Sequence, residues 1–389
     1  MGHPIYLDGF ATLPLAPEAL EAMLAIWAHP GNAGSPNISG EIAARAIADA
    51  RELVADLIAA APSEVTFTSG ATEANNLAIL GVARAARRME PTRNRIVVSA
   101  IEHKAVLEPA HALQSEGFEI SIAPVDGCGR LDLVEFAKLV DQDLLLASVM
   151  MVNNETGVIQ PVKEAAALAH EGGALFHSDA AQAAGKIDVD VLDLDVDYLT
   201  LSAHKCYGPM GIGALYVAAS APRPVPMMLG GGQQSGLRPG TEPVALIAGF
   251  GAAARVAIER LSLDREHCSG LIAQLLETLQ QRQLRFRRVS GDAPTVPGTA
   301  SIQLIGIDAD ELCTRIARQV SLSTGSACTS GQIKSSHVLE SIGLSEIDAR
   351  GVIRIFCNRY QNSAEILRAA DHIVEVAALS CLETGDVHQ

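Results

Sequence analysis

Short apolar runs alternate with amphipathic stretches between about residues 50 and 220. The runs are rich in Val, Ile, Leu and Ala, which is typical of parallel strands buried on both faces. The expected strands are 64–68, 96–99, 120–123, 145–149, 174–177, 198–201 and 214–217. Helical periodicity marks 42–60 and connecting segments such as 162–170. Strands that alternate with helices predict an α/β fold with a mainly parallel sheet covered on both faces.

The pattern changes after residue 220. Residues 221–243 are rich in Pro and Gly and predict a long connection, which in a compact protein is usually functional or linking. A long Ala-rich helical region follows, and then a second α/β pattern. Its expected elements are helices at 243–283, 308–319 and 364–378 and strands at 301–304 and 352–356. We therefore predict a large domain over 16–258 and a smaller C-terminal α/β domain over 259–389, with an N-terminal segment, 1–15, packed on the smaller one.

The composition narrows the class of protein. Hydrophobic residues make up 48% and charged residues 19%, which suits a packed core and excludes wholesale disorder. The net charge of −16 argues against direct nucleic-acid binding, and the basic stretches 84–95 and 282–288 are expected to be solvated helix ends or strand edges. No apolar run is long enough to predict a membrane span. The start of the chain lacks a secretion signal, and seven scattered cysteines indicate reduced thiols, so we expect a cytoplasmic protein.

Candidate chemistry follows the expected strands, because open α/β sheets bind ligands where strands end. Ser69–Glu73 lies between a strand and a helix, where glycine and free helix amides suit an anion. The competing interpretation is simple helix capping with Thr72 as the N-cap. Asp179 follows another strand and can hold the nitrogen of a heterocycle in its protonated form. It can equally cap the next helix.

Lys205 follows the strand at 198–201. Desolvation there would lower the pKa of the amine and make it a nucleophile or Schiff-base former, whereas a lone lysine is more often a surface residue. A lysine, a carboxylate and an anion-binding turn in this order are together what pyridoxal phosphate requires. We therefore expect this cofactor.

A reactive thiol is predicted near the C-terminal end. Cys328 lies among Gly, Ser and Thr residues in 323–330, so exposure makes it a candidate nucleophile. Cys206 is the competing thiol, but its place beside the lysine fits a packing role better. Metal and dinucleotide motifs are absent from the sequence: there is no C-x-x-C, no H-E-x-x-H and no G-x-G-x-x-G between strand and helix.

Several motifs in order resemble the cysteine desulfurases, pyridoxal-phosphate enzymes of the class V aminotransferase type. They are Tyr6–Asp8, Thr68–Asn76, Glu102–Lys104, Val152–Gly157, Asp179–Gln182, His204–Pro209, Arg238–Thr241 and Gly325–Ser330. The stretch from Cys328 to Arg354 is similar to the branch with a long mobile cysteine loop, which serves iron–sulfur or thio-cofactor assembly. The resemblance implies the pyridoxal-phosphate aminotransferase fold, called fold type I, and a homodimer.

The resemblance also implies how the cofactor is held. Lys205 would bind its aldehyde and later move the Cα proton, and His103 would stack on the ring and shuttle protons. Asp179 would pair with the ring nitrogen and Gln182 with the ring oxygen. The remaining cofactor contacts implied are Ala71, Thr72, Asn154, Ser202, His204 and, from the neighbouring subunit, Thr241.

For the substrate, the resemblance implies that Asn154 and Arg354 bind the carboxylate of L-cysteine. Cys328 would take the sulfur as a persulfide, leaving alanine, and pass it to a sulfur-acceptor protein such as an iron–sulfur scaffold or a relay. No resident metal is implied, although Cys328 is also a candidate for a transient iron–sulfur ligand.

Four segments depart from the family pattern: 11–14, 32–37, 233–235 and 355–358. A selenocysteine lyase, another class V aminotransferase or β-lyase, and a catalytically weak scaffold of a sulfur system therefore stay open as alternatives. An aminotransferase or β-lyase would need no loop thiol and would release a 2-oxo acid instead of alanine. The acceptor of the sulfur is left unidentified by the sequence.

Overall fold

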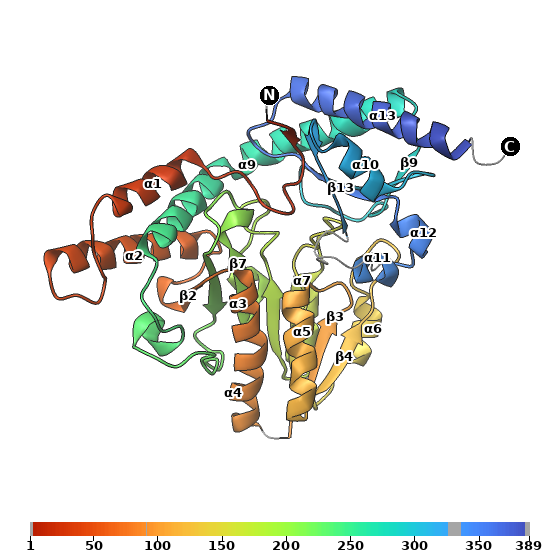
Figure 1. Cartoon of the computed structure of the whole chain (residues 1–389). Helices are drawn as coiled ribbons and strands as arrows, with labels where there is room; N and C mark the ends of the chain where they lie inside the picture. The colour runs from red at the N-terminus through yellow and green to blue at the C-terminus, as the bar shows by residue number, and fades with distance from the viewer. Residues whose placement is uncertain (1–2, 91, 326–335, 386–389) are drawn as a thin grey trace.

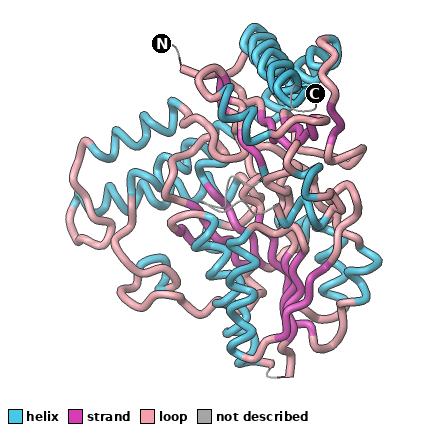
Figure 2. Tube along the Cα trace, turned by 45° about the vertical axis from the view of Figure 1, so that its right-hand side comes forward, coloured by secondary structure: helices cyan, strands magenta, loops and turns pink. Residues whose placement is uncertain are grey.

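The chain folds around a seven-stranded sheet flanked by helices (Figures 1 and 2). The computed structural model describes residues 3–90, 92–325 and 336–385, with side chains in the last segment as far as residue 379. The strands, in sheet order, are β2 (Val65–Thr68), β8 (Gly213–Val217), β7 (Tyr198–Ser202), β6 (Leu175–Asp179), β5 (Leu144–Ser148), β3 (Arg95–Ser99) and β4 (Glu119–Ala123). From β7 to β4 all neighbours are parallel, whereas β8 runs antiparallel to both β7 and β2. All seven expected strands are confirmed to within two residues at each end.

Helices cover both faces of this sheet because both faces are apolar. In β3, Ile96 and Val98 belong to the core formed with the helices that follow β2 and β3, whereas Val97 belongs to the core on the opposite face. The period of two along a strand explains this alternation. The helices of the large unit are α1 (Pro17–Trp27), α2 (Ile38–Asp56), α3 (Ala71–Asn76), α4 (Val82–Met89), α5 (Lys104–Ala112), α6 (Leu133–Lys138), α7 (Val162–Glu171) and α8 (Val191–Leu194). A π-helical turn, Leu77–Gly81, joins α3 to α4.

The second unit contains an antiparallel sheet of four strands. Their order is β12 (Ser323–Thr324), β13 (Val352–Phe356), β10 (Thr299–Leu304) and β9 (Phe286–Arg288). Its helices are α10 (Ala309–Ile316), α11 (His337–Ser341), α12 (Glu346–Ala349) and α13 (Ser363–Gly385). The edge strand β9 contains the last three residues of the basic stretch 282–288, and its two arginines are exposed, so the expectation of a solvated strand edge is confirmed for this part.

One long helix, α9 (Val244–Gln281), runs through both units (Figure 1). Its first half contributes Phe250 and Ala254 to the core of the large unit, and its second half contributes Leu271 and Leu275 to the core of the small one. The predicted boundary at residue 258 therefore lies inside a continuous helix, between the two cores.

The N-terminal segment contacts both units. Strand β1 (Ile5–Tyr6) pairs in parallel with β11 (Val320–Ser321) of the small unit, and Leu7 is buried in that unit's core. Phe10 and Leu13 instead belong to the core of the large unit. The segment is thus a second connection between the two units, besides α9.

The predicted helix at 42–60 begins earlier and ends earlier than expected. It is α2, which starts at Ile38 because the Asn37 side chain accepts a hydrogen bond from the Gly40 amide at 2.9 Å and caps the helix. The helix ends before Ala59, which has a φ of 54°. Within the described residues, no helix is long and apolar enough to cross a lipid bilayer.

Candidate active site

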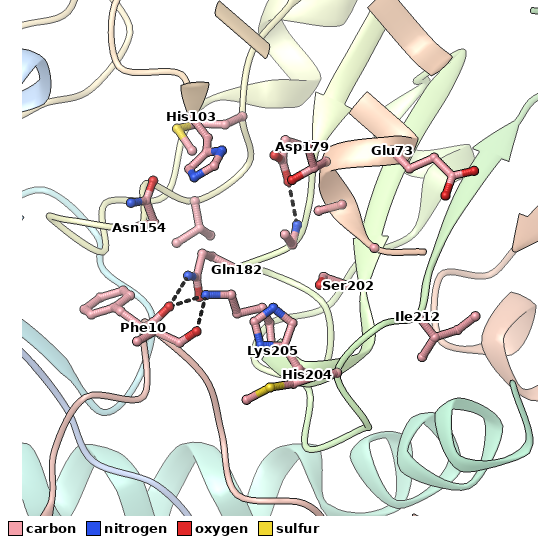
Figure 3. A pocket seen from close by; sticks show the side chains of 18 of the residues that line it. Phe10, Glu73, His103, Asn154, Asp179, Gln182, Ser202, His204, Lys205 and Ile212 are labelled. Carbon is pink, nitrogen blue, oxygen red and sulfur yellow. Dashed lines mark hydrogen bonds between the residues drawn. The ribbon is translucent and has the colours of Figure 1, made fainter. Parts of the chain in front are cut away.

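A cavity of about 560 Å³ opens at the carboxyl edge of the large sheet. Parallel strands end at one edge, so residues that follow different strands meet there. The cavity is lined by ten of the twelve predicted site residues: Ala71, Thr72, His103, Asn154, Asp179, Gln182, Ser202, His204, Lys205 and Arg354. Figure 3 shows His103, Asp179 and Lys205 around a common space.

Two predicted site residues are not brought to this cavity by the described chain. Thr241 is exposed and does not line it. Cys328 lies in 326–335, outside the described residues.

The start of α3 forms a cradle suited to an anion. Gly70 precedes the helix with a φ of 147°, a conformation that favours glycine, and nothing lies within 4 Å of where its Cβ would be. No side chain at position 70 therefore separates the backbone from the cavity. The first N–H groups of α3 have no partner within the helix and are free to bind an anion at its N-terminus. The interpretation of Thr72 as the N-cap is wrong, because the N-cap is Gly70 and Thr72 is the second residue of the helix.

Asp179 ends β6 and is almost fully buried. Its Oδ1 accepts the backbone N–H of Ala181 at 2.9 Å (Figure 3), and its Oδ2 accepts the side-chain N–H of Asn75 at 2.6 Å. The alternative that Asp179 caps the next helix is wrong, because a turn follows it and the next helix, α8, is capped by Asp190. The carboxylate stays in the wall of the cavity.

The Lys205 amine points to the N-terminal segment. It donates hydrogen bonds to the carbonyls of Phe10 and Ala11, the latter at 2.8 Å. Gln182 Nε2 also donates to the Phe10 carbonyl, at 2.9 Å (Figure 3). Both of these contacts are to carbonyls of the N-terminal segment, and they keep the amine close to the cavity.

Both histidines of the cavity are neutral near pH 7. Burial is the main cause that lowers the pKa of His103, with the charge of Asp179 opposing it. Burial, followed by the charge of Lys205, lowers the pKa of His204 to about 4. His103 Nδ1 accepts the N–H of Ala105 at 3.0 Å, which assigns the ring proton to Nε2.

Arg354 brings a positive charge from β13 of the small unit. It is 3% exposed, its Nε donates to Ser323 Oγ at 2.7 Å, and its Nη1 donates to the carbonyl of Asn154 at 3.3 Å. Asp8 Oδ1 lies 3.6 Å from its Nη2. The guanidinium thus stands at the junction of the two units, where it can bind a carboxylate.

Sequence reasoning missed several residues of this site. Phe10 and Ala11 act through backbone carbonyls, which leave no side-chain signal in a sequence. Asn75 lies inside a quoted motif, and its position four residues after Ala71 on the same helix face was the signal that could have found it. Cys206, the competing thiol, is buried, and burial raises its pKa to about 11, so it has a packing role.

Three comparisons place these features among known proteins. The model of the family "Aminotransferase class-V" matches residues 5–368. A mitochondrial cysteine desulfurase of Candida albicans is 39% identical over 379 residues, covering 96% of this chain and 76% of that protein. The structure of a NifS-like protein superposes with a TM-score of 0.89 at 34% identity, covering 97% of this chain and all of the other. The structure of SspA in complex with cysteine superposes with a TM-score of 0.79 at 37% identity, covering 92% of this chain and all of the other.

Proposed function

The chain belongs to the class V aminotransferase family and is a cysteine desulfurase, and from this premise we propose which of its side chains release sulfur from L-cysteine. The observation that carries the proposal is the meeting of Lys205, Asp179 and the start of α3 in one cavity. Enzymes of this family depend on pyridoxal 5′-phosphate, and the residues present fit it: an amine, a carboxylate for the ring nitrogen and an anion cradle. When bound, the cofactor supplies an electron sink for negative charge at the substrate Cα.

We propose the following division of work around the cofactor. Lys205 holds the aldehyde and then moves the proton at Cα, while Asp179 keeps the ring nitrogen protonated. His103, with its proton on Nε2, is placed to donate or accept a proton at the substrate. Gln182 would contact the ring oxygen. The backbone of Ala71 and the side chains of Thr72, Ser202 and His204 would hold the phosphate.

Substrate recognition is proposed for Asn154 and Arg354. The buried guanidinium of Arg354 offers N–H donors to the carboxylate of L-cysteine, which the SspA structure holds as its ligand. The thiolate of Cys328 then attacks the substrate sulfur: an S–S bond forms, the Cβ–S bond breaks, and the electron pair of that bond returns to carbon, which is protonated to give alanine. The persulfide sulfur leaves to a thiol of an acceptor protein.

We also propose a homodimer in a reducing, cytoplasmic setting. Thr241 is exposed and does not line the cavity of its own chain, which supports its assignment to the phosphate of a neighbouring subunit. Arg238 on the same loop pairs with Glu73 of α3 at 3.1 Å and fixes that loop beside the cradle. The five cysteines with described side chains form no disulfide, as a reducing setting requires. A solution mass of twice 40.8 kDa is the expected result of light scattering.

The experiment that tests the function combines product analysis with trapping. The purified protein with pyridoxal phosphate, L-cysteine and a thiol reductant is expected to form alanine and sulfide in equal amounts, and Cys328→Ala to lose both, whereas Cys206→Ala retains them. Borohydride reduction and peptide mapping are expected to place the cofactor on Lys205 and not on Lys186, a buried lysine nearby. A 2-oxo acid instead of alanine, or a label elsewhere, would contradict the proposal.

A further inference from the structure

Asn75 is a fully buried amide in the wall behind Asp179. It lies on α3, one turn after Ala71 and Thr72, so the same helix reaches the phosphate cradle with its first turn and Asp179 with its second. Its Nδ2 donates a hydrogen bond of 2.6 Å to Asp179 Oδ2. This short contact joins α3 to the end of β6.

The two oxygens of Asp179 are held from two directions. The backbone N–H of Ala181 fixes Oδ1 within its own turn, and Asn75 fixes Oδ2 from a different element. Each donor uses one of the two lone pairs of its oxygen, so acceptor capacity is left for a further N–H. Together the two donors define the plane of the carboxylate, which a single local cap would not do.

The rest of the amide makes no competing contact. Asn75 Oδ1 is buried and has no hydrogen-bond partner among the described residues. Leaving a polar atom unpaired in the interior is unfavourable, and an apolar side chain of the same size would avoid it. The hydrogen bond to Asp179 is therefore the contact that accounts for an amide at position 75.

We infer that Asn75 is a positioning residue for the cofactor ring. It fixes the Asp179 carboxylate in the orientation that accepts the ring N–H, and because an amide N–H can only donate, it favours the ionised carboxylate as the partner of a protonated ring. Because α3 also carries the phosphate cradle, the spacing between the two cofactor contacts is set by one helix. This inference rests on the proposed function, since it assumes that Asp179 faces the ring nitrogen.

The test compares Asn75→Leu with the matched control Asn76→Ala. Asn76 is the next residue of the same helix, but its Nδ2 bonds to the carbonyl of Thr72 instead of to Asp179. Two quantities are measured for each purified protein: the affinity of its cofactor-free form for pyridoxal phosphate, and the pH midpoint of the visible absorption of the bound cofactor. Circular dichroism of the cofactor-free proteins checks the fold, and Asn75→Ala, which also removes Nδ2, replaces Asn75→Leu if the latter does not fold.

Asn75→Leu is expected to weaken cofactor binding about tenfold, as for the loss of a hydrogen bond to a charged group. The pH midpoint is expected to rise by about half a unit or more. The variant would hold the proton on the ring nitrogen less firmly, and a ring without that positive charge repels less the proton on the nitrogen that joins Lys205 to the cofactor. Asn76→Ala should change neither. Unchanged affinity and midpoint in Asn75→Leu, or equal changes in the control, would overturn the inference. Wild-type protein that binds no pyridoxal phosphate would instead overturn the proposed function.

Discussion

Replacing Glu155 by glutamine is expected to change how the stability of the protein depends on pH. Glu155 lies in the turn after β5, is 6% exposed, and accepts a hydrogen bond of 2.5 Å from Ser336 Oγ of the small unit. Gly325 packs so closely on it that a Cβ there would lie 2.2 Å from its Oε2. A carboxyl group is thus enclosed where the two units meet.

The magnitude follows from the pKa of this carboxyl. Burial, partly offset by the Ser336 hydrogen bond and the charge of Arg354, raises the pKa of Glu155 from 4.5 to about 7. Because the folded state binds the proton more tightly than the unfolded state, the stabilising contribution is full below pH 4.5 and is lost as pH rises through 7. The loss amounts to about 3 kcal/mol of unfolding free energy by the usual value per pKa unit.

Denaturant unfolding of the wild type and Glu155→Gln between pH 5 and pH 9 measures this difference. The neutral amide can still accept from Ser336 and does not ionise, so the wild type should lose about 3 kcal/mol relative to the variant as pH rises. Glu164→Gln, at an exposed carboxyl on α7, is the control and should leave the wild-type pH profile unchanged. If the unfolding free energies of the wild type and of Glu155→Gln change by the same amount between pH 5 and pH 9, the reasoning is refuted.

Three further substitutions have defined outcomes. Gly157→Ala should lower stability by about 2 kcal/mol or more in thermal unfolding, because Gly157 has a φ of 74° and its Cβ would lie 2.6 Å from Thr299 Oγ1; a wild-type melting temperature would contradict this. Arg359→Leu should lower stability, because it removes the 2.6 Å ion pair with the buried Asp264 carboxylate. The cost should stay below the roughly 3–5 kcal/mol of a fully broken buried pair, since Asp264 keeps its 3.2 Å contact with Arg260, and adding Asp264→Leu should restore part of the loss. Glu102→Gln should bind the cofactor with the affinity of the wild type at pH 7. Burial raises the pKa of Glu102 to about 8, so the carboxyl is mostly protonated at that pH and the amide resembles it. Weaker binding of the variant at pH 7 would show that the negative charge is needed.

The sheet and the cavity were predictable from the sequence because their signals are local. Strands buried on both faces appear as apolar runs, and the positions of Asp179 and Lys205 follow from where those runs end. Strand direction was not predictable: nothing in Gly213–Val217 indicates that β8 runs antiparallel to its neighbours. Direction depends on the route of the connecting loops and not on the residues of the strand itself.

The contacts that the sequence could not provide are those between distant segments. The carbonyl of Phe10 meets the amine of Lys205 across 195 positions of the chain, and a carbonyl group is the same for every residue type. Asn75 meets Asp179 across 104 positions, and a buried amide in a short helix has no pattern that identifies its partner. The sequence suggested Thr72 as the helix cap because threonine favours the N-cap position. In the structure Gly70 occupies that position.

The pairing of β1 with β11 has a consequence for biosynthesis. Ile5 and its partner Val320 are separated by 315 positions (320 − 5), so the segment that supplies carbonyls to the lysine stays without its strand partner until most of the polypeptide has been translated. Contacts between such distant residues form slowly because a large loop must close first. The N-terminal segment can therefore take its final place beside the cavity only near the end of synthesis. We expect nascent chains that end before residue 320 to be unable to bind the cofactor.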